Sequence, residues 1–275
     1  MGWPREACVP ANDAGFGSIG ADMEAMEKFK LTGRVAVVTG GSMGLGRAMA
    51  VGLAGAGARV AVVSRTKKLI AETAAEIVRK GGDAIAVAAD VTREDDIEGM
   101  VAEVCGKYGT VDILVNNAGI GGSGKSVALS TEAWDRMMNT NAKSVFLASR
   151  AAGRFMIRQK RGKIINVSSV LGKGALPYSL HYGASKAAVI HMTKTLALEW
   201  APFHINVNGI APGWFLTDMT KDQQQGESEK FLLGKIPFGR FGKPEEIVGL
   251  AVFLSSPASD YITGQTVFID GGYSI

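Results

Sequence analysis

Cysteine is scarce in this chain, which has two cysteines, Cys8 and Cys105, among its 275 residues. They lie far apart in the sequence without a paired spacing, which argues against a disulfide framework and against a zinc site. The three histidines, His181, His191 and His204, show no metal-ligand spacing either. We therefore expect no bound metal, and a reducing compartment, the cytoplasm, is the simplest location.

Long hydrophobic runs are also lacking. No apolar run approaches the roughly 20 residues that a membrane-spanning helix needs, and the start of the chain lacks the basic and apolar regions of a secretory signal. Residues 1–28 are rich in Gly, Ala, Asp and Pro up to about Ala21 and are expected to form a flexible N-terminal extension. The sequence therefore predicts that the protein has no membrane partner.

Basic residues are not gathered into a dense face interleaved with aromatic residues, although the net charge is +4. This argues against nucleic acid as a partner. A modest positive excess is compatible with an anionic cofactor or substrate.

From Arg34 onward, short β-branched runs alternate with longer Ala-rich stretches of helical period, which is typical of βαβ units. Strands are expected at 35–39, 59–64, 84–89, 112–117, 163–169, 205–211 and 266–270, and helices at 45–56, 67–80, 93–107, 131–160 (with a break), 182–201 and 244–255. The predicted fold is α/β: a single Rossmann domain over residues 29–275, with a doubly wound, seven-stranded parallel sheet and helices on both faces. Its ligand should lie at the carboxyl ends of the strands.

One segment, at about 214–243, departs from this alternation because it is polar and contains glycines between the sixth strand and the next helix. We interpret it as a lid over the substrate. Trp214, at its start, is compatible either with the core or with direct substrate contact.

A glycine-rich segment, TGGSMGLG at 39–46, connects the first strand to a helix. Gly40, Gly44 and Gly46 would let the chain turn tightly and bring backbone N–H groups close to a pyrophosphate at the helix N-terminus. The spacing is one residue longer than in the G-x-G-x-x-G fingerprint. On its own, the segment is equally compatible with a glycine turn that binds nothing.

The end of the second strand indicates which cofactor is bound. An NAD-specific site would place an acidic residue there to hold the ribose 2′-hydroxyl, but the sequence reads Ser64, Arg65, Thr66. Arg65 could bind a 2′-phosphate through charge-assisted hydrogen bonds, with help from Ser64 and Thr66. This favours NADP(H) over NAD(H). The alternative is that these residues form only the solvated start of a helix and bind no phosphate.

Tyr182 and Lys186 are four residues apart and share one face of the helix expected at 182–201, while Ser169 ends a strand. A phenol has a pKa of about 10 and must lose its proton near neutral pH to act as a general base. A neighbouring ammonium and a positive nicotinamide would lower that pKa, and Ser169 would hold the substrate oxygen. A Tyr/Lys surface pair is the plain alternative. A hydrolase is disfavoured because there is no G-x-S-x-G elbow.

These motifs together resemble the short-chain dehydrogenase/reductase family, from about Leu31 to the C-terminus. The matching segments are TGGSMGLG at 39–46, DV at 90–91, NNAG at 116–119, Ser169 with YGASK at 182–186, and PGWFLT at 212–217. The resemblance implies an NADP(H)-dependent oxidoreductase, usually a homotetramer, that interconverts a secondary alcohol and a ketone.

The resemblance also implies the site residues. The catalytic set would be Asn141, Ser169, Tyr182 and Lys186, with Asn141 in a helix distortion that supports a proton relay towards Lys186. The cofactor would be bound by Gly40, Ser42, Met43, Gly44, Leu45, Gly46, Ser64, Arg65, Thr66, Asp90, Val91, Asn117, Ala118, Gly119, Tyr182, Lys186, Pro212, Gly213, Phe215 and Thr217. Met43 is a departure, because many NADP-specific members carry a basic residue there.

The substrate is weakly encoded. The chain is similar to bacterial sugar-acid dehydrogenases such as gluconate 5-dehydrogenase and also to 3-oxoacyl thioester reductases. We expect a sugar acid, a simple ketone or a similar small carbonyl compound. A 3-oxoacyl thioester is the alternative: Phe203 stands where carrier-dependent members have a basic residue, but Lys160 and Arg161 leave that alternative open. A non-catalytic NADP-binding module is a third interpretation.

Overall fold

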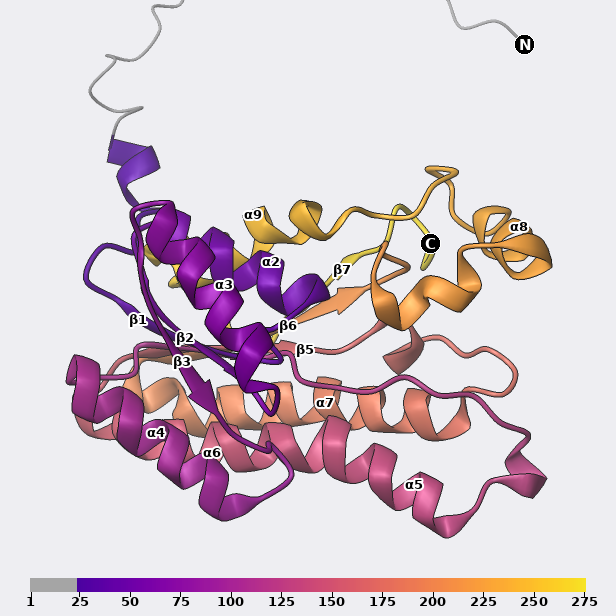
Figure 1. Cartoon of the computed structure of the whole chain (residues 1–275), viewed down its shortest axis with the longest axis horizontal. Coiled ribbons are helices and arrows are strands. Elements are labelled where there is room, and N and C mark those ends of the chain that lie inside the picture. The colour runs from indigo at the N-terminus through magenta and orange to yellow at the C-terminus, as the bar shows by residue number, and fades with distance from the viewer. Residues whose placement is uncertain (1–23) are drawn as a thin grey trace, which may run out of the picture.

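A seven-stranded sheet, with every neighbouring pair parallel, runs through the computed structural model, which describes residues 24–275 (Figure 1). The strand order is β3-β2-β1-β4-β5-β6-β7. The strands are β1 (Val35–Thr39), β2 (Arg59–Ser64), β3 (Asp83–Ala88), β4 (Ile113–Asn116), β5 (Gly162–Val167), β6 (Ile205–Pro212) and β7 (Thr266–Ile269). The order reverses between β1 and β4, which creates a crevice at their carboxyl ends. The predicted doubly wound α/β fold is confirmed.

Helices cover both faces of the sheet. They are α2 (Gly44–Gly55), α3 (Lys67–Arg79), α4 (Glu94–Tyr108), α5 (Thr131–Met138), α6 (Ser144–Gln159), α7 (Leu180–Trp200), α8 (Gly226–Leu233) and α9 (Val248–Ser255). Figure 1 shows α4, α6 and α7 on one side of the sheet and α2, α3 and α9 on the other.

The strands are apolar on both faces because both are buried. In β1, Val35 and Val37 pack into the core that includes residues of α4 and α6. The alternate residues Ala36 and Val38 pack into the core formed with α2, α3 and α9. Successive side chains of a strand point to opposite faces, so a continuous apolar run is what a doubly covered sheet requires.

The break expected in the helix at 131–160 is a π-helical turn, Asn139–Lys143, between α5 and α6. Asn141 lies in this turn and is fully buried. Its Nδ2 donates to the carbonyl of Ile120 at 2.9 Å, and its Oδ1 accepts from the N–H of Ile120 at 2.8 Å. The distorted turn is therefore tied to the chain just beyond β4.

The segment at 214–243 forms a 3-10 helix, Asp218–Gln223, followed by α8. Trp214, Leu232 and Phe241 pack into a small core of their own, and the Trp214 ring lies 4.5 Å from the ring of Tyr273. The start of the segment is thus attached to the C-terminal part of the chain. Its role as a lid stays a prediction.

The expected N-terminal extension lies mostly outside the described residues, since residues 1–23 are not described. The carbonyl of Lys28 accepts a hydrogen bond from the N–H of Ala258 at 3.2 Å, and Phe29 packs near Phe253. Across residues 24–275, no helix has the length and apolar composition needed to cross a membrane.

Candidate active site

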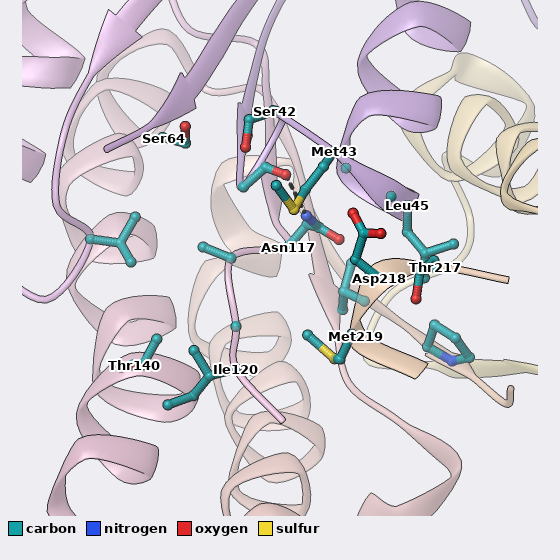
Figure 2. Close-up of a pocket in the computed structure, with 18 of the residues that line it drawn as sticks. Ser42, Met43, Leu45, Ser64, Asn117, Ile120, Thr140, Thr217, Asp218 and Met219 are labelled. Carbon is teal, nitrogen blue, oxygen red and sulfur yellow. Dashed lines mark hydrogen bonds between the residues drawn. The ribbon is translucent and has the colours of Figure 1, made fainter. Parts of the chain in front are cut away.

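A cavity of about 370 Å³ opens at the carboxyl ends of the strands (Figure 2). Every residue that the sequence analysis assigned to the cofactor lines it, and so does Ser169. Of the expected site residues, Asn141 alone lies outside the lining, because it is buried behind the wall. Figure 2 shows Ser42 and Met43 on the glycine-rich loop, across the cavity from Ile120 and Thr140. Segments far apart in the sequence therefore meet at one site.

The glycine-rich loop approaches the end of β4 too closely to carry side chains. A Cβ at Gly46 would lie 2.1 Å from the carbonyl oxygen of Gly40 and 2.3 Å from Nδ2 of Asn117. Gly40 and Gly44 have positive φ angles of 64° and 53°, which glycine adopts at no steric cost. Asn117 fastens the loop by donating from Nδ2 to the carbonyl of Gly40 at 3.2 Å. The glycines are thus required by the shape of the cavity floor.

The loop leads into the N-terminus of α2, where Met43 is the N-cap and provides no capping side chain. The first turn of α2 also contains no acidic residue. The N–H groups of a first helical turn lack partners within the helix, and they attract anions. This cradle of backbone donors fits the pyrophosphate of a dinucleotide.

Arg65 follows β2 directly, at the point where the 2′-phosphate was expected to bind. Its Nη1 lies 3.8 Å from Oδ2 of Asp90, and its side chain is 72% exposed. Thr92 donates to Oδ1 of Asp90 from its N–H at 2.9 Å and from its hydroxyl at 2.7 Å. Burial opposes ionisation of Asp90, but these hydrogen bonds and the Arg65 charge hold its pKa below the ordinary value. The rim of the cavity therefore presents an exposed guanidinium beside a carboxylate that Thr92 holds in place.

Tyr182 and Lys186 both reach the cavity from the first turns of α7, and Ser169 reaches it from the end of β5. Ser168 joins the two elements, because its hydroxyl donates to the carbonyl of Lys186 at 2.8 Å. Lys186 donates from Nζ to the carbonyl of Val167 at 2.9 Å. The three candidate catalytic side chains are thereby held at one end of the cavity.

Burial shifts the pKa values of the two titratable side chains at this end of the cavity. It raises the pKa of Tyr182 above its ordinary value, and the neighbouring Ser169 side chain partly offsets this. Burial also lowers the pKa of Lys186 to about 8. The Nζ of Lys186 lies 5.9 Å from the centre of the Tyr182 ring and is directed at a backbone carbonyl. Burial therefore dominates the phenol pKa in the protein alone, and its lowering by Lys186 and a positive nicotinamide stays a prediction.

Asn141 connects the π-helical turn to α7. Its Nδ2 lies 3.2 Å from the hydroxyl of Ser185, which in turn donates to the carbonyl of Tyr182 at 2.7 Å. A Cβ placed on Gly119 would lie 3.2 Å from Oδ1 of Asn141 and 3.5 Å from Nζ of Lys186. Asn141 and Lys186 thus both approach Gly119, with Asn141 buried outside the cavity lining.

Sequence reasoning missed several lining residues, among them Ile120, Thr140, Asp218 and Met219. Each lies within three residues of one that was identified, so adjacency to a motif was the available signal. Trp214 does not line the cavity and is 8% exposed, which favours a core role over substrate contact. Within residues 24–275, no cluster of His, Cys, Asp and Glu could hold a metal ion.

The chain is similar to a known protein family, to known proteins and to solved structures. Residues 40–274 match the family model described as enoyl-(acyl carrier protein) reductase. A 3-oxoacyl-[acyl-carrier-protein] reductase of Synechocystis sp. is 41% identical over 244 residues, which covers 88% of this chain and 97% of that protein. An NAD-dependent glycerol dehydrogenase of Listeria innocua is 42% identical over 247 residues, which covers 90% of this chain and 96% of that protein.

The structure of a gluconate 5-dehydrogenase from Burkholderia cenocepacia, in complex with NADP and tartrate, is also similar. It superposes with a TM-score of 0.88 at 37% identity, over 91% of this chain and 98% of that one. The names of the three relatives state different substrates, and the two that mention a cofactor differ in it, NAD in one and NADP in the other.

Proposed function

The chain belongs to the short-chain dehydrogenase/reductase family of oxidoreductases, and from this we propose that it is an NADP(H)-dependent enzyme that interconverts a small ketone and a secondary alcohol. One observation carries the proposal: Ser169, Tyr182 and Lys186 converge on a cavity whose other end is a glycine-rich anion cradle. When bound, the nicotinamide supplies the hydride for reduction or accepts it in oxidation.

Tyr182 is proposed as the general acid and base. In reduction, its hydroxyl gives a proton to the carbonyl oxygen as the oxygen becomes an alcohol, and in oxidation the phenolate takes that proton back. The raised pKa of Tyr182 keeps the phenol protonated at neutral pH, which suits the reductive direction. The Ser169 hydroxyl would donate a hydrogen bond to the same oxygen and stabilise the charge that develops on it.

Lys186 and Asn141 are proposed to support this proton transfer. With a pKa of about 8, Lys186 is largely an ammonium at neutral pH, and its charge lies close enough to Tyr182 to favour the phenolate once the proton has left. Asn141 is a positioning residue, because its hydrogen bonds to Ile120 and Ser185 fix the wall near Lys186.

NADP(H) is favoured over NAD(H) because an exposed guanidinium, that of Arg65, stands at the end of β2 in place of an acid. An arginine binds a phosphate through paired, charge-assisted hydrogen bonds. The relative with NADP in its complex supports this choice, while the NAD-dependent relative makes the comparison of the two cofactors a necessary test.

The substrate is proposed to be a small carbonyl compound, a class that includes keto-sugar acids and simple ketones. A 3-oxoacyl thioester is the second candidate, favoured by the similarity to a 3-oxoacyl-[acyl-carrier-protein] reductase. A carrier protein would need exposed basic residues near the site. Arg161 is 55% exposed, but its guanidinium is paired with the buried carboxylate of Asp112, at 3.1 Å, and Phe203 packs against the main core. Both observations favour the small carbonyl compound.

We further propose a homotetramer in the cytoplasm. The helices α6 and α7 expose large apolar side chains, Phe146 at 45% and Leu198 at 80%, which an interface between subunits would cover. The low cysteine count is compatible with a reducing compartment.

The function is tested by following NADPH and NADH oxidation with simple ketones, keto-sugar acids and 3-oxoacyl thioesters. We expect turnover with at least one small carbonyl compound and faster turnover with NADPH. Binding of NADPH, seen as a thermal shift, without turnover of any class would instead indicate a non-catalytic binding module.

A further inference from the structure

Few charged side chains line the cavity. We propose that the substrate of this chain is uncharged: a small ketone or secondary alcohol that carries no carboxylate or phosphate. The inference rests on the proposed reductase function and narrows its substrate class from small carbonyl compounds to neutral ones.

Basic side chains are few in the cavity. Among the described residues that line it, Arg65 and Lys186 are the two with a basic side chain. Arg65 follows β2, at the end of the cavity far from Tyr182, and lies 3.8 Å from Asp90. Lys186 lies beside Tyr182 but donates to the carbonyl of Val167. Neither side chain is placed to pair with an anionic group on the substrate.

An acidic residue faces the cavity instead. Figure 2 shows the Asp218 carboxylate directed into the cavity, beside Asn117. Within the described part of the chain, Asp218 has no ion-pair partner. Its negative charge offers no attraction to a substrate carboxylate in the cavity.

The wall that includes Ile120, Thr140 and Met219 carries no charged side chain. Ile120 and Met219 contribute aliphatic side chains, and the side chain of Met219 reaches across to Gly121, where a Cβ would lie 3.3 Å from its Cγ. The side chain of Met219 in Figure 2 points from the segment after β6 towards the chain that carries Ile120. Moving a carboxylate from water to such a wall without a cationic partner is unfavourable.

Two lysines of this region face a different hollow. Lys173 and Lys235 line a separate depression with Tyr273, and their ammonium groups lie 5.3 Å and 4.8 Å from the ring centres of Phe268 and Phe231. They are therefore engaged with aromatic rings and do not line the candidate active site.

The test compares substrates that match in carbon skeleton and differ in charge. Suitable pairs are acetoacetate with methyl acetoacetate, levulinate with methyl levulinate, and 5-keto-D-gluconate with L-sorbose. The reductive direction is measured with saturating NADPH, because reduced nicotinamide carries no positive charge that would attract an anion. In each pair in which turnover is detected, we expect the neutral member to have the higher kcat/KM, by at least about tenfold.

Two variants test the cause of this preference. Met219→Lys places a cation on the apolar wall and should raise kcat/KM for the anionic member relative to the neutral one, by about tenfold. Met219→Gln, similar in length but neutral, is the matched control and should leave the ratio close to that of the wild type. Asp218→Asn should shift the ratio towards the anionic member without adding a positive charge.

Binding is measured beside turnover, through the change in NADPH fluorescence when each compound is added. An anionic member that is bound and reduced as well as its neutral partner, or better, would overturn the charge inference and leave the reductase function standing. Tighter binding of the neutral members without reduction of any compound would support the charge inference and contradict the reductase function. If Met219→Lys does not fold, the wild type and Asp218→Asn still decide the question.

Discussion

Asn117, at the end of β4, donates from Nδ2 to the carbonyl of Gly40, in the loop after β1, at 3.2 Å. A second hydrogen bond from the same nitrogen reaches the carbonyl of Thr39 at 3.1 Å. These contacts join the two strands between which the order of the sheet reverses. The anion cradle therefore depends on the contacts between the ends of β1 and β4 as well as on the glycines in the loop.

Replacement of Gly46 by alanine tests this junction. The new Cβ would lie 2.1 Å from the carbonyl oxygen of Gly40, so the loop must move and lose its contact with Asn117. We expect a loss of stability of about 1–3 kcal/mol, as for other overpacked sites, and at least about tenfold weaker NADPH binding. Denaturant unfolding and NADPH fluorescence titration measure the two effects.

Gly55→Ala is the matched control, because Gly55 ends the same helix and a Cβ there would have no atom within 4 Å. It should leave NADPH binding unchanged. Equal NADPH affinity in the wild type and in Gly46→Ala would show that the loop does not form the cofactor cradle.

The choice of cofactor is tested by Arg65→Ala. Loss of a charge-assisted contact with the 2′-phosphate should raise the KM for NADPH by about 10- to 100-fold and change the KM for NADH little. Lys68→Ala, three residues along the chain and in α3, is the control and should preserve the preference. If Arg65→Ala kept the full preference for NADPH, recognition of the phosphate would lie elsewhere.

The buried Lys186 makes stability depend on pH. Its pKa is about 8 in the folded protein and 10.5 for an unperturbed lysine, so the unfolded chain binds more protons between these values and stability rises as pH increases through them. Lys186→Met lacks this effect. Between pH 7 and 9.5, the unfolding free energy of the wild type should gain about 2 kcal/mol relative to that of the variant.

This difference is measured by urea unfolding of both proteins at the two pH values, which cancels the contributions of all other titrating groups. Parallel changes in the two proteins would mean that Lys186 keeps an ordinary pKa in the folded state. Its burial would then not control its charge.

The sequence predicted most of the fold because apolar runs and Ala-rich helices alternate regularly. The strand bounds differ from the structure by at most two residues at either end. The break between α5 and α6 was expected, but its cause, the bonding of Asn141 to Ile120, involves residues 21 positions apart that local periodicity does not relate. Asn141 was identified through family resemblance alone.

The substrate end of the site was the least predictable. Asp218 and Met219 follow a recognised motif, but whether they face the cavity depends on the path of the segment after β6, which no periodic pattern specifies. Trp214 was compatible with the core and with substrate contact, because large apolar residues serve both purposes. Its packing against Tyr273 is a tertiary contact that becomes visible only in the structure.

The central claim is that Tyr182 transfers the proton to and from the substrate oxygen. Tyr182→Phe keeps the ring and removes the hydroxyl, so the claim is tested by measuring kcat with NADPH and a ketone substrate together with the Kd for NADPH. The account predicts a fall in kcat of about 10²- to 10⁴-fold, the range for loss of a general acid, with NADPH affinity within about threefold of the wild type. A variant that retained wild-type turnover would contradict it.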